Sequence, residues 1–545
     1  GGVKTHRNSK VIGPLLIAAA ALAAAPIAAT LWGAFAAGGA EAAAEAPMAA
    51  RYAMGTAMLC LLVGLGAAAL GAGTAMLVCL ADFPGRRLFS IALVLPFAIP
   101  AYVGAYAYGD FFGPFGLAAS LVGVKNLPEI HSLPGAAFIL TLTTYPYVYL
   151  SVRASLSGRS AALMEAARSL GASPMRSTFK VLLAVSRPAL AGGLALALME
   201  TAADYGVADF YGVQTLSVGI FRTWQGLGDL AGATQLAATL FFVALLLVLL
   251  EESGRRGAVA ESAKAHRRAL RLKLSPAHGA AAVILCSLPV LAGFFIPAFV
   301  LIAKLDPQLS LTAARGLSES FANTATVAAA GAAMAMLLAV ALAYGARRAP
   351  SAAGKLAIRV ATLGYAVPGA VIAIGILALT AGLSRFTGTL AAGGVGVLLY
   401  AYTARFLTAG YNAAAGGLAQ VSQQMDAAAQ SLGAGPGRIL REIHWPQTSG
   451  AILAGAAIVA IDIAKELPAT LLLRPFNFET LSTRIYRLAS DERLADAAPA
   501  ALLLIAFGLI PALVLSMLGG DKKARGAPGA AGEALLEPAG YSPPR

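Results

Sequence analysis

The chain has 545 residues, of which 58% are hydrophobic and only 12% are charged, and its formal net charge is +14. Soluble domains carry roughly 25% charged residues, so this composition excludes an ordinary soluble protein and predicts a helical membrane protein with many spans. The three cysteines lie far apart in apolar runs and the five histidines are scattered, which indicates neither a disulfide framework nor a fixed metal site. The sequence has no GxxxxGK[ST] loop, so we predict no ATP site on this chain.

Twelve stretches are long and apolar enough to be interpreted as membrane-spanning helices. A span needs about 20 apolar residues, and residues 230–250, for example, contain no charge. The basic segment 1–10 precedes an apolar run longer than the roughly 7–15 residues of a signal-peptide core, which favours an uncleaved first helix. The expected spans are 11–36, 53–80, 88–109, 134–152, 181–204, 230–250, 277–303, 320–345, 356–383, 393–412, 448–470 and 498–519.

The distribution of basic residues predicts the orientation. With the N-terminus in the cytoplasm, most of the 40 Lys and Arg residues fall on the cytoplasmic side, as the positive-inside rule requires. We therefore expect both termini in the cytoplasm. The positive charge then favours contact with anionic lipid, and no nucleic-acid partner is expected. The segments assigned to the cytoplasm are 1–10, 81–88, 153–187, 251–275, 346–359, 405–450 and 520–545.

The spans divide into two halves of six. The basic stretch between spans six and seven predicts a cytoplasmic linker, and the Gly-, Ala- and Pro-rich end predicts a disordered tail. The expected organisation is a first half at 1–250 with a polar loop at 155–187, a linker at 251–276, a second half at 277–519 with a polar loop at 413–447, and a tail at 520–545.

The two polar loops have nearly the same sequence. Residues 165–174 read EAARSLGASP and residues 426–436 read DAAAQSLGAGP. Further along, the TLS of 215–217 recurs at 480–482. Each copy has six spans in the same orientation, and parallel repeats of this kind are related by an axis along the membrane normal. We therefore expect a substrate path between the halves.

The loops resemble the EAA motif of binding-protein-dependent ABC importer permeases, in which Gly follows the Glu of Glu-Ala-Ala by six residues. The first copy has Ala184 where Pro is usual, and the second has Ala427 where Glu is usual, with Asp426 as the nearest acidic substitute. The resemblance implies an all-α fold of about 12 transmembrane helices in two parallel six-helix repeats, similar to type I ABC importer permeases. It also implies ATPase-coupling roles for Glu165, Ala166, Ala167, Gly171, Asp426, Ala428 and Gly433.

These loops have the composition of short docking helices. Alanine favours a helix, glycine permits a sharp turn, and a helix can dock in a groove of a partner. Closure of an ATPase pair would then push the halves between inward-open and outward-open states. An ordinary amphipathic loop helix is the alternative.

Other stretches narrow the resemblance. DFPGRR (82–87), LPFAIPAYV (95–103), DYGVADFYGVQT (204–215) and KELPATLLLRPFNFETLSTRIY (465–486) are similar to the fused twelve-span permeases of ferric iron importers. This similarity implies ferric iron as substrate, an extracytoplasmic ferric-iron-binding protein, and two copies of an ATP-binding subunit that carry ATP and Mg and perform the hydrolysis. The chain itself is then not an enzyme and binds no cofactor. Thiamine or another small solute is the alternative substrate, and an ion-coupled secondary transporter is the alternative of another class.

Two acidic pairs lie within predicted spans. Glu200 and Asp204 are one helical turn apart, and Asp462 and Glu466 occupy the matching places in the second half. Ionisable residues at membrane depth are costly and usually line a pathway. The axis that relates the two halves leads us to expect all four carboxylates to face one substrate path. Their oxygen ligands suit a hard cation. Transient contact with Fe³⁺ is expected at Glu200 and Asp462, with no fixed metal site.

A structural role for these carboxylates is the alternative. Asp204 and Glu466 would then be caps, or the second pair would bind Lys465 or Arg474. Three nearby tyrosines are predicted to form an interfacial aromatic belt, with cation ligation as the alternative; they are Tyr102, Tyr106 and Tyr108. The polar segment 474–493 is expected either to meet a substrate-binding protein or to rest on lipid.

Overall fold

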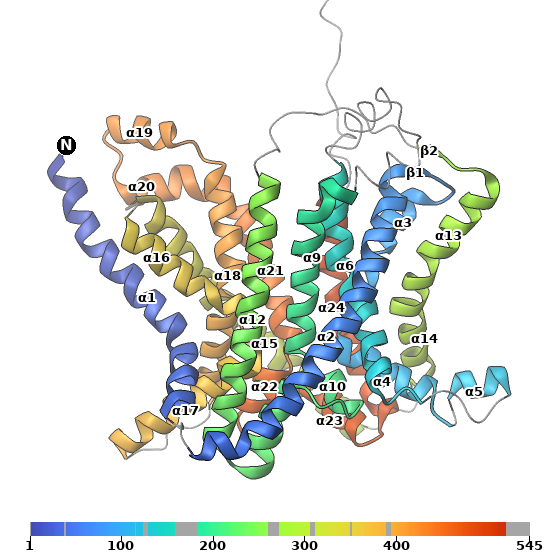
Figure 1. Cartoon of the computed structure of the whole chain (residues 1–545). Coiled ribbons are helices and arrows are strands. Elements are labelled where there is room, and N and C mark those ends of the chain that lie inside the picture. Colours follow the sequence, from blue (N-terminus) through green and yellow to red (C-terminus); the bar gives the residue numbers. More distant parts are fainter. Residues whose placement is uncertain are drawn as a thin grey trace, which may run out of the picture.

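A computed structural model of the chain is a bundle of helices (Figure 1). It describes residues 2–36, 40–114, 116–123, 129–157, 183–259, 272–305, 311–348, 351–388 and 394–518. The one sheet found in these residues consists of two short strands, β1 (Ala81–Asp82) and β2 (Leu272–Lys273), which pair in parallel. The predicted all-α fold is confirmed.

The helices follow the predicted order of apolar stretches. The first half contains α1 (Gly2–Ala36), α2 (Ala40–Leu80), α3 (Arg86–Ala92), η1 (Leu95–Ala98), α4 (Ala101–Phe111), α5 (Leu117–Val122), α6 (Leu133–Ser157), α9 (Leu183–Ala203), α10 (Gly206–Phe210), α11 (Leu216–Phe221), η3 (Arg222–Gly226) and α12 (Leu230–Val259). The second half contains α13 (Pro276–Val290), η4 (Leu291–Phe295), α14 (Ile296–Ala303), α15 (Leu311–Arg348), α16 (Ala352–Ala361), η5 (Thr362–Ala366), α17 (Gly369–Thr387), α18 (Val395–Ala419), α19 (Gln423–Ser431), α20 (Pro436–Ile439), η6 (Leu440–His444), α21 (Trp445–Lys465), α22 (Pro468–Leu473), α23 (Leu481–Ser490) and α24 (Leu494–Leu518).

The helices give a lower count of membrane spans than the apolar stretches do. Within the described residues, 7 helices are long and apolar enough to cross a membrane, or 9 if each of two bent pairs counts as one span. Each expected span overlaps a helix or a bent pair, but α9, α18 and α24 are not among those that meet the criteria of length and apolarity. The count of twelve therefore stays a prediction.

Two spans break at matching places in the two halves. The helices on either side of the break meet at 90° in the α3–α4 pair and at 107° in the α16–α17 pair. Pro100 and Pro368 stand at these breaks, and a proline drives the residue before it out of the helical conformation. Ile99 and Val367 accordingly have extended ψ angles of 118° and 123°. After each break the chain enters a helix, α4 or α17, that is largely buried in the core of the bundle.

The first helix of each half packs against the opposite half. In Figure 1, α1 lies beside α16 and α17, and α14 lies beside α4. Hydrogen bonds also join the halves: Thr30 of α1 donates to the carbonyl oxygen of Val371 in α17 at 3.1 Å, and Tyr108 of α4 donates to that of Ala292 in η4, just before α14, at 2.7 Å. The two halves are thus interlocked by an exchange of their first helices.

Matching residues also hold matching elements together. The Thr56 hydroxyl accepts a hydrogen bond from the Leu216 amide at 2.9 Å, and the Thr324 hydroxyl accepts one from the Leu481 amide at 2.8 Å. Both amides begin short helices, α11 and α23, whose N-caps are Thr215 and Thr480. The TLS repeat in the sequence therefore corresponds to a repeated local structure.

The segment expected as a linker contains regular structure at both ends. α12 continues to Val259, so the first part of the segment expected as a linker from residue 251 is helical. β2, near the end of that segment, pairs with β1 of the first half. Most of the first polar loop, residues 158–182, and the expected tail lie outside the described residues.

Candidate functional site

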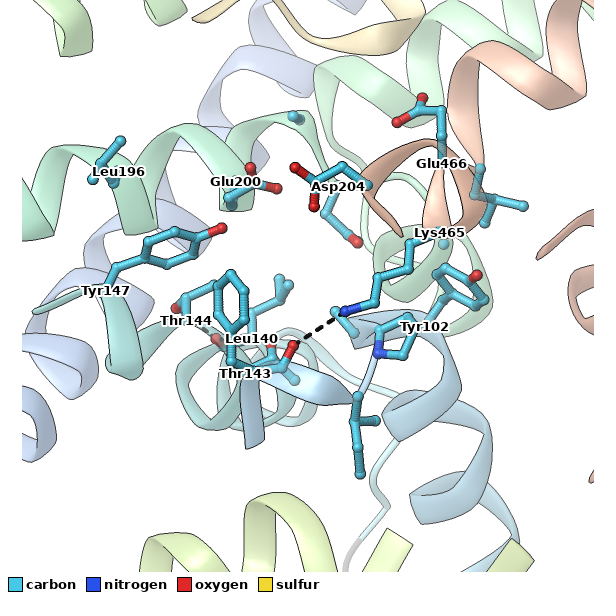
Figure 2. A pocket seen from close by; sticks show the side chains of 18 of the residues that line it. Tyr102, Leu140, Thr143, Thr144, Tyr147, Leu196, Glu200, Asp204, Lys465 and Glu466 are labelled. Carbon is cyan, nitrogen blue, oxygen red and sulfur yellow. Dashed lines mark hydrogen bonds between the residues drawn. The ribbon is translucent and has the colours of Figure 1, made fainter. Parts of the chain in front are cut away.

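A cavity of about 470 Å³ lies where the C-terminal ends of α9 and α21 meet. Its walls come from α4, α6 and α9 of the first half and from α18, α21 and α22 of the second. All four predicted carboxylates line it: Glu200, Asp204, Asp462 and Glu466. Figure 2 shows Glu200 and Asp204 on one side and Glu466 and Lys465 on the other. The structure thus brings together acidic residues that lie more than 250 residues apart in the chain.

The first residue of each acidic pair, Glu200 or Asp462, which we call the inner carboxylate, has no partner among the described residues. Glu200 is exposed to the cavity and Asp462 is partly exposed. Neither carboxylate makes a hydrogen bond or an ion pair with any other residue that the structure describes. Both are therefore available to a ligand in the cavity.

The outer member of each pair stabilises a short helix. Asp204 Oδ1 accepts hydrogen bonds from the amides of Val207 and Ala208 at 2.9 and 3.2 Å, at the start of α10. Glu466 Oε1 accepts one from the amide of Ala469 at 3.0 Å, at the start of α22. Carboxylates are favourable at helix N-termini, because the free amides there carry partial positive charge. The capping alternative from the sequence thus describes the outer pair, although both residues also line the cavity.

Two basic residues share the cavity with the carboxylates. Arg405 Nη1 lies 3.1 Å from Glu466 Oε1, and the Glu466 side chain is only 4% exposed. The Lys465 ammonium is 3.5 Å from the Phe97 carbonyl oxygen and 5.7 Å from the centre of the Phe97 ring. Glu466 therefore pairs with Arg405, and not with Lys465 or Arg474, the partners considered from the sequence.

The position of Arg405 corrects the sequence assignment. The count of basic residues placed 405–450 on the cytoplasmic side, whereas Arg405 lies within α18 on the cavity wall. Counting charges by segment missed it, because α18 begins ten residues before it. An arginine inside an apolar run is itself a sign of a buried functional site, and that sign was present in the sequence.

The three tyrosines do not form an interfacial belt. Tyr102, Tyr106 and Tyr108 are buried in the core, at 5%, 2% and 3% exposure. Tyr102 lies on the cavity wall, and its hydroxyl has no hydrogen-bond partner among the described residues. The belt interpretation is therefore wrong, because α4 bends into the bundle after Pro100 instead of continuing to a membrane surface.

No metal site is preformed in the described part of the chain. Within it, no three His, Cys, Asp or Glu side chains are close enough to hold a metal ion together. The cavity thus offers carboxylates spread along its wall and no closed coordination shell.

The second polar loop forms a helix, a turn and a second helix. α19 begins after Ser422, whose side chain accepts a hydrogen bond from the Gln424 amide. Gly433, with φ of 79°, supplies the left-handed turn before α20, a conformation that favours glycine. Ala428 and the 86% exposed Leu432 lie on the open surface of this segment. The first copy, with Glu165, Ala166, Ala167 and Gly171, lies outside the described residues.

Asp426 is bound by the chain's own residues. Arg347 donates from Nε to Asp426 Oδ2 at 2.9 Å, and His444 Nε2 lies 2.7 Å from Asp426 Oδ1. Arg347 also donates to the carbonyl oxygens of Leu418 and Val421, at 2.7 and 2.9 Å. Both carboxylate oxygens of Asp426 thus have partners within the chain, and its expected contact with an ATPase stays a prediction.

This tie holds over the ordinary pH range. Burial acts to raise the pKa of Asp426, but the hydrogen bonds and charges of His444 and Arg347 outweigh it, so the pKa lies below its ordinary value of 3.8. A carboxylate with a lowered folded-state pKa contributes stability above its ordinary pKa and loses it as the pH falls through the folded value. Neutral and mildly acidic conditions therefore leave the tie intact.

The segment 474–493 forms a second hollow, of about 660 Å³, at the start of α23. Glu479 lies 2.6 Å from Arg487 Nε and 3.5 Å from Arg484 Nη1. Phe476 nearby is 94% exposed. The segment thus combines an ion-pair network with an exposed aromatic ring, a composition found at protein interfaces.

Residues 67–251 match the protein family described as "binding-protein-dependent transport system inner membrane component". The matched region runs from α2 to α12 and contains Glu200 and Asp204. Together with the helical bundle and its apolar spans, this match defines the class: the chain is a multi-pass membrane permease, as the polar loops predicted.

Comparison with individual proteins is more specific. The chain is 28% identical over 474 residues to the Fe(3+)-transport system permease protein FbpB 2 of Haemophilus influenzae, a match that covers 86% of this chain and 90% of that protein. It is 30% identical to the probable sulfate transport system permease protein cysT of Nephroselmis olivacea and 28% identical to the sulfate transport system permease protein CysT of Escherichia coli. These matches cover 31% and 30% of this chain and 61% and 62% of the sulfate permeases. The chain is thus similar over most of its length to an Fe(3+) permease, and over residues 67–251 to the inner membrane components of binding-protein-dependent transport systems.

Proposed function

We propose that the chain is the translocation subunit of an ATP-driven importer of ferric iron in a bacterial inner membrane. One observation supports the assignment of the substrate: a chain similar over 86% of its length to an Fe³⁺ permease has a cavity lined by four carboxylates. Oxygen ligands suit a hard cation and do not suit sulfate. Glu200 and Asp462 make the transient contacts with the cation, while Asp204 and Glu466 hold α10 and α22 in place.

Movement comes from separate subunits. Two copies of an ATP-binding subunit, which carry ATP and Mg, dock on the two polar loops and hydrolyse ATP. Docking at the second loop uses its exposed surface, including Ala428 and Leu432, and Gly433 sets the turn. In the first loop, Glu165, Ala166, Ala167 and Gly171 form the equivalent surface. Both loops and both termini face the cytoplasm, and the chain binds no cofactor of its own.

Substrate arrives from the opposite side. A ferric-iron-binding protein meets the segment 474–493, where the exposed Phe476 ring and the arginines around Glu479 offer a mixed aromatic and charged surface. Release of the ion into the cavity follows when the halves open towards that side.

Reconstituted transport tests the proposal. The permease, its ATP-binding subunit and its binding protein are placed in vesicles, and uptake of radiolabelled iron is followed with ATP inside or outside. We expect uptake that needs ATP and the binding protein, and that excess unlabelled thiamine or sulfate does not reduce. A matched preparation with a hydrolysis-defective ATPase is the control and should show background uptake.

Two results would contradict the proposal. Uptake of iron driven by an ion gradient without ATP would favour the secondary transporter. ATP-dependent uptake of thiamine or sulfate, with none of iron, would retain the ABC permease and reject the substrate.

A further inference from the structure

A pathway lined by carboxylates must also allow the bound cation to dissociate from them. A multivalent cation that binds carboxylates strongly enough to enter must also leave, and conduction requires binding weak enough for exit. In this cavity Arg405 is committed to Glu466, at 3.1 Å. The Lys465 ammonium is the basic group that remains available among the residues lining the cavity.

Lys465 has a defined resting place. Its ammonium lies 3.5 Å from the Phe97 carbonyl oxygen and 5.7 Å from the Phe97 ring centre, and Figure 2 shows the side chain reaching across the cavity to this contact. Gly508 of α24 packs closely against this place, because a Cβ atom there would clash with the carbonyl oxygen of Ala98 and would lie 2.6 Å from the ammonium nitrogen. The carbonyl oxygen, the aromatic face and the glycine together hold the ammonium between η1 and α24.

The same side chain can reach the uncommitted carboxylates. Lys465 follows Asp462 by three residues on α21, so both side chains lie on one face of the helix. Glu200 faces the cavity from α9. A lysine ammonium is a compact charge on a flexible stem. Its contacts with Phe97 are one long hydrogen bond and the face of the ring, which a carboxylate, as a stronger electrostatic partner, replaces.

We propose that Lys465 is a movable internal cation: its ammonium leaves the place between η1 and α24, pairs with Glu200 and Asp462, and expels a metal cation bound there. The step is an exchange of one cation for another on the same carboxylates and breaks no covalent bond. The inference rests on the proposed cation pathway and adds to it the group that drives release.

Binding of Tb³⁺ tests this exchange, because Tb³⁺ takes oxygen ligands and its luminescence is excited through nearby tyrosines such as Tyr102 and Tyr205 on the cavity wall. The full chain in detergent is titrated with Tb³⁺, and release is started with excess chelator. Lys465→Met should bind Tb³⁺ about tenfold more tightly and release it more slowly, since removing one nearby positive charge changes the interaction by roughly 1.4 kcal/mol or more. Lys355→Met, at an exposed lysine of α16, is the matched control and should behave as the wild type.

The variants separate this inference from the proposal on which it rests. Glu200→Gln/Asp462→Asn should lose the tight Tb³⁺ signal, and an unchanged signal in this double variant would reject the cation pathway itself. A reduced signal there, together with unchanged or weaker binding by Lys465→Met, would reject only the role of Lys465. If Lys465→Met does not remain folded in size-exclusion chromatography, Lys465→Gln, which still donates to Phe97, gives the same comparison, and Lys465→Arg should resemble the wild type.

Discussion

At the residue scale, the four cavity carboxylates occupy matching places in the repeat but have different partners. Asp204 and Glu466 accept hydrogen bonds from the first amides of α10 and α22, and Glu466 also neutralises Arg405. Glu200 and Asp462 make no hydrogen bond or ion pair with a residue that the structure describes. Substitutions in the two groups should therefore have different consequences.

We expect the inner carboxylates to affect transport and the outer ones to affect stability. Glu200→Gln and Asp462→Asn remove no recorded contact, so stability should change by less than about 0.5 kcal/mol while iron uptake falls. Glu466→Gln leaves the part-buried Arg405 without its counter-charge, and losing one partner of a buried ion pair costs at most about 3–5 kcal/mol. Thermal unfolding of each purified variant, measured beside uptake, checks this division.

A further variant separates the cap from the ion pair. Asp204 caps α10 but forms no ion pair with a described residue, so Asp204→Ala should cost only the roughly 0.5–2 kcal/mol of a lost helix cap. Its loss of stability should therefore lie between those of Asp462→Asn and Glu466→Gln. If Asp462→Asn unfolds as readily as Glu466→Gln, the inner carboxylate has a structural role, and its assignment to the pathway is wrong.

The sequence could reveal the acidic pairs but not all of their partners. A carboxylate in an apolar run is visible one residue at a time, and helical spacing pairs Glu200 with Asp204. The partner of Glu466 is 61 residues away on another helix, and that of Asp426 is 79 residues away. Such pairings depend on how the helices pack, which neither spacing nor composition encodes.

At the element scale, a part-buried tie attaches α19 to the bundle. Asp426 near its start binds Arg347 at the end of α15 and His444 just before α21. The tie therefore connects α19 to two long helices of the second half, one of which, α21, carries the cavity carboxylate Asp462.

Asp426→Asn should uncouple the second polar loop from the bundle. The substitution removes the negative charge opposite Arg347 while keeping a side chain of the same shape. We expect faster amide hydrogen exchange in α19 and less iron transported per ATP hydrolysed. Hydrogen exchange by mass spectrometry and parallel transport and ATPase assays give the two measurements.

A neighbouring ion pair supplies the control. Arg438 and Glu442 form an exposed pair one turn apart, at 2.9 Å, and exposed pairs contribute little. Glu442→Gln should leave both measurements unchanged. An unaltered transport-to-hydrolysis ratio in Asp426→Asn would show that the tie does not transmit movement.

Most elements were predictable because apolar run length fixes where a helix can cross a membrane. The breaks at Pro100 and Pro368 were not, because a proline in an apolar run is compatible with either a kinked helix or a broken one. The extended conformation at Ile99 and Val367 decides it, and it explains why Tyr102 points into the bundle.

At the scale of the whole molecule, the exchanged first helices hold the halves together. α1 packs on α16 and α17, while α13 and α14 pack on η1, α3 and α4. Helices in membranes associate through such packing and through hydrogen bonds between them, including those of Thr30 and Tyr108. The association should not depend on the covalent linker.

A chain divided within residues 260–271 should therefore still assemble. We expect the two fragments, produced together, to copurify through a tag on either one. A first fragment that begins at residue 40 and so lacks α1 should recover several times less of its partner. Fragments that both reach the membrane but do not copurify would show that the linker, and not the exchange, holds the halves.

The exchange also decides which parts can travel as rigid units. Sequence order divides the chain at the linker, but α1 is seated in the second half and the α13–α14 segment in the first. Each rocking unit is thus a composite of both halves, and the chain crosses from one unit to the other after Ala36 and again after Ala303. Alternating access would then carry α1 along with the second half and the α13–α14 segment along with the first, so neither half could move without a helix of the other.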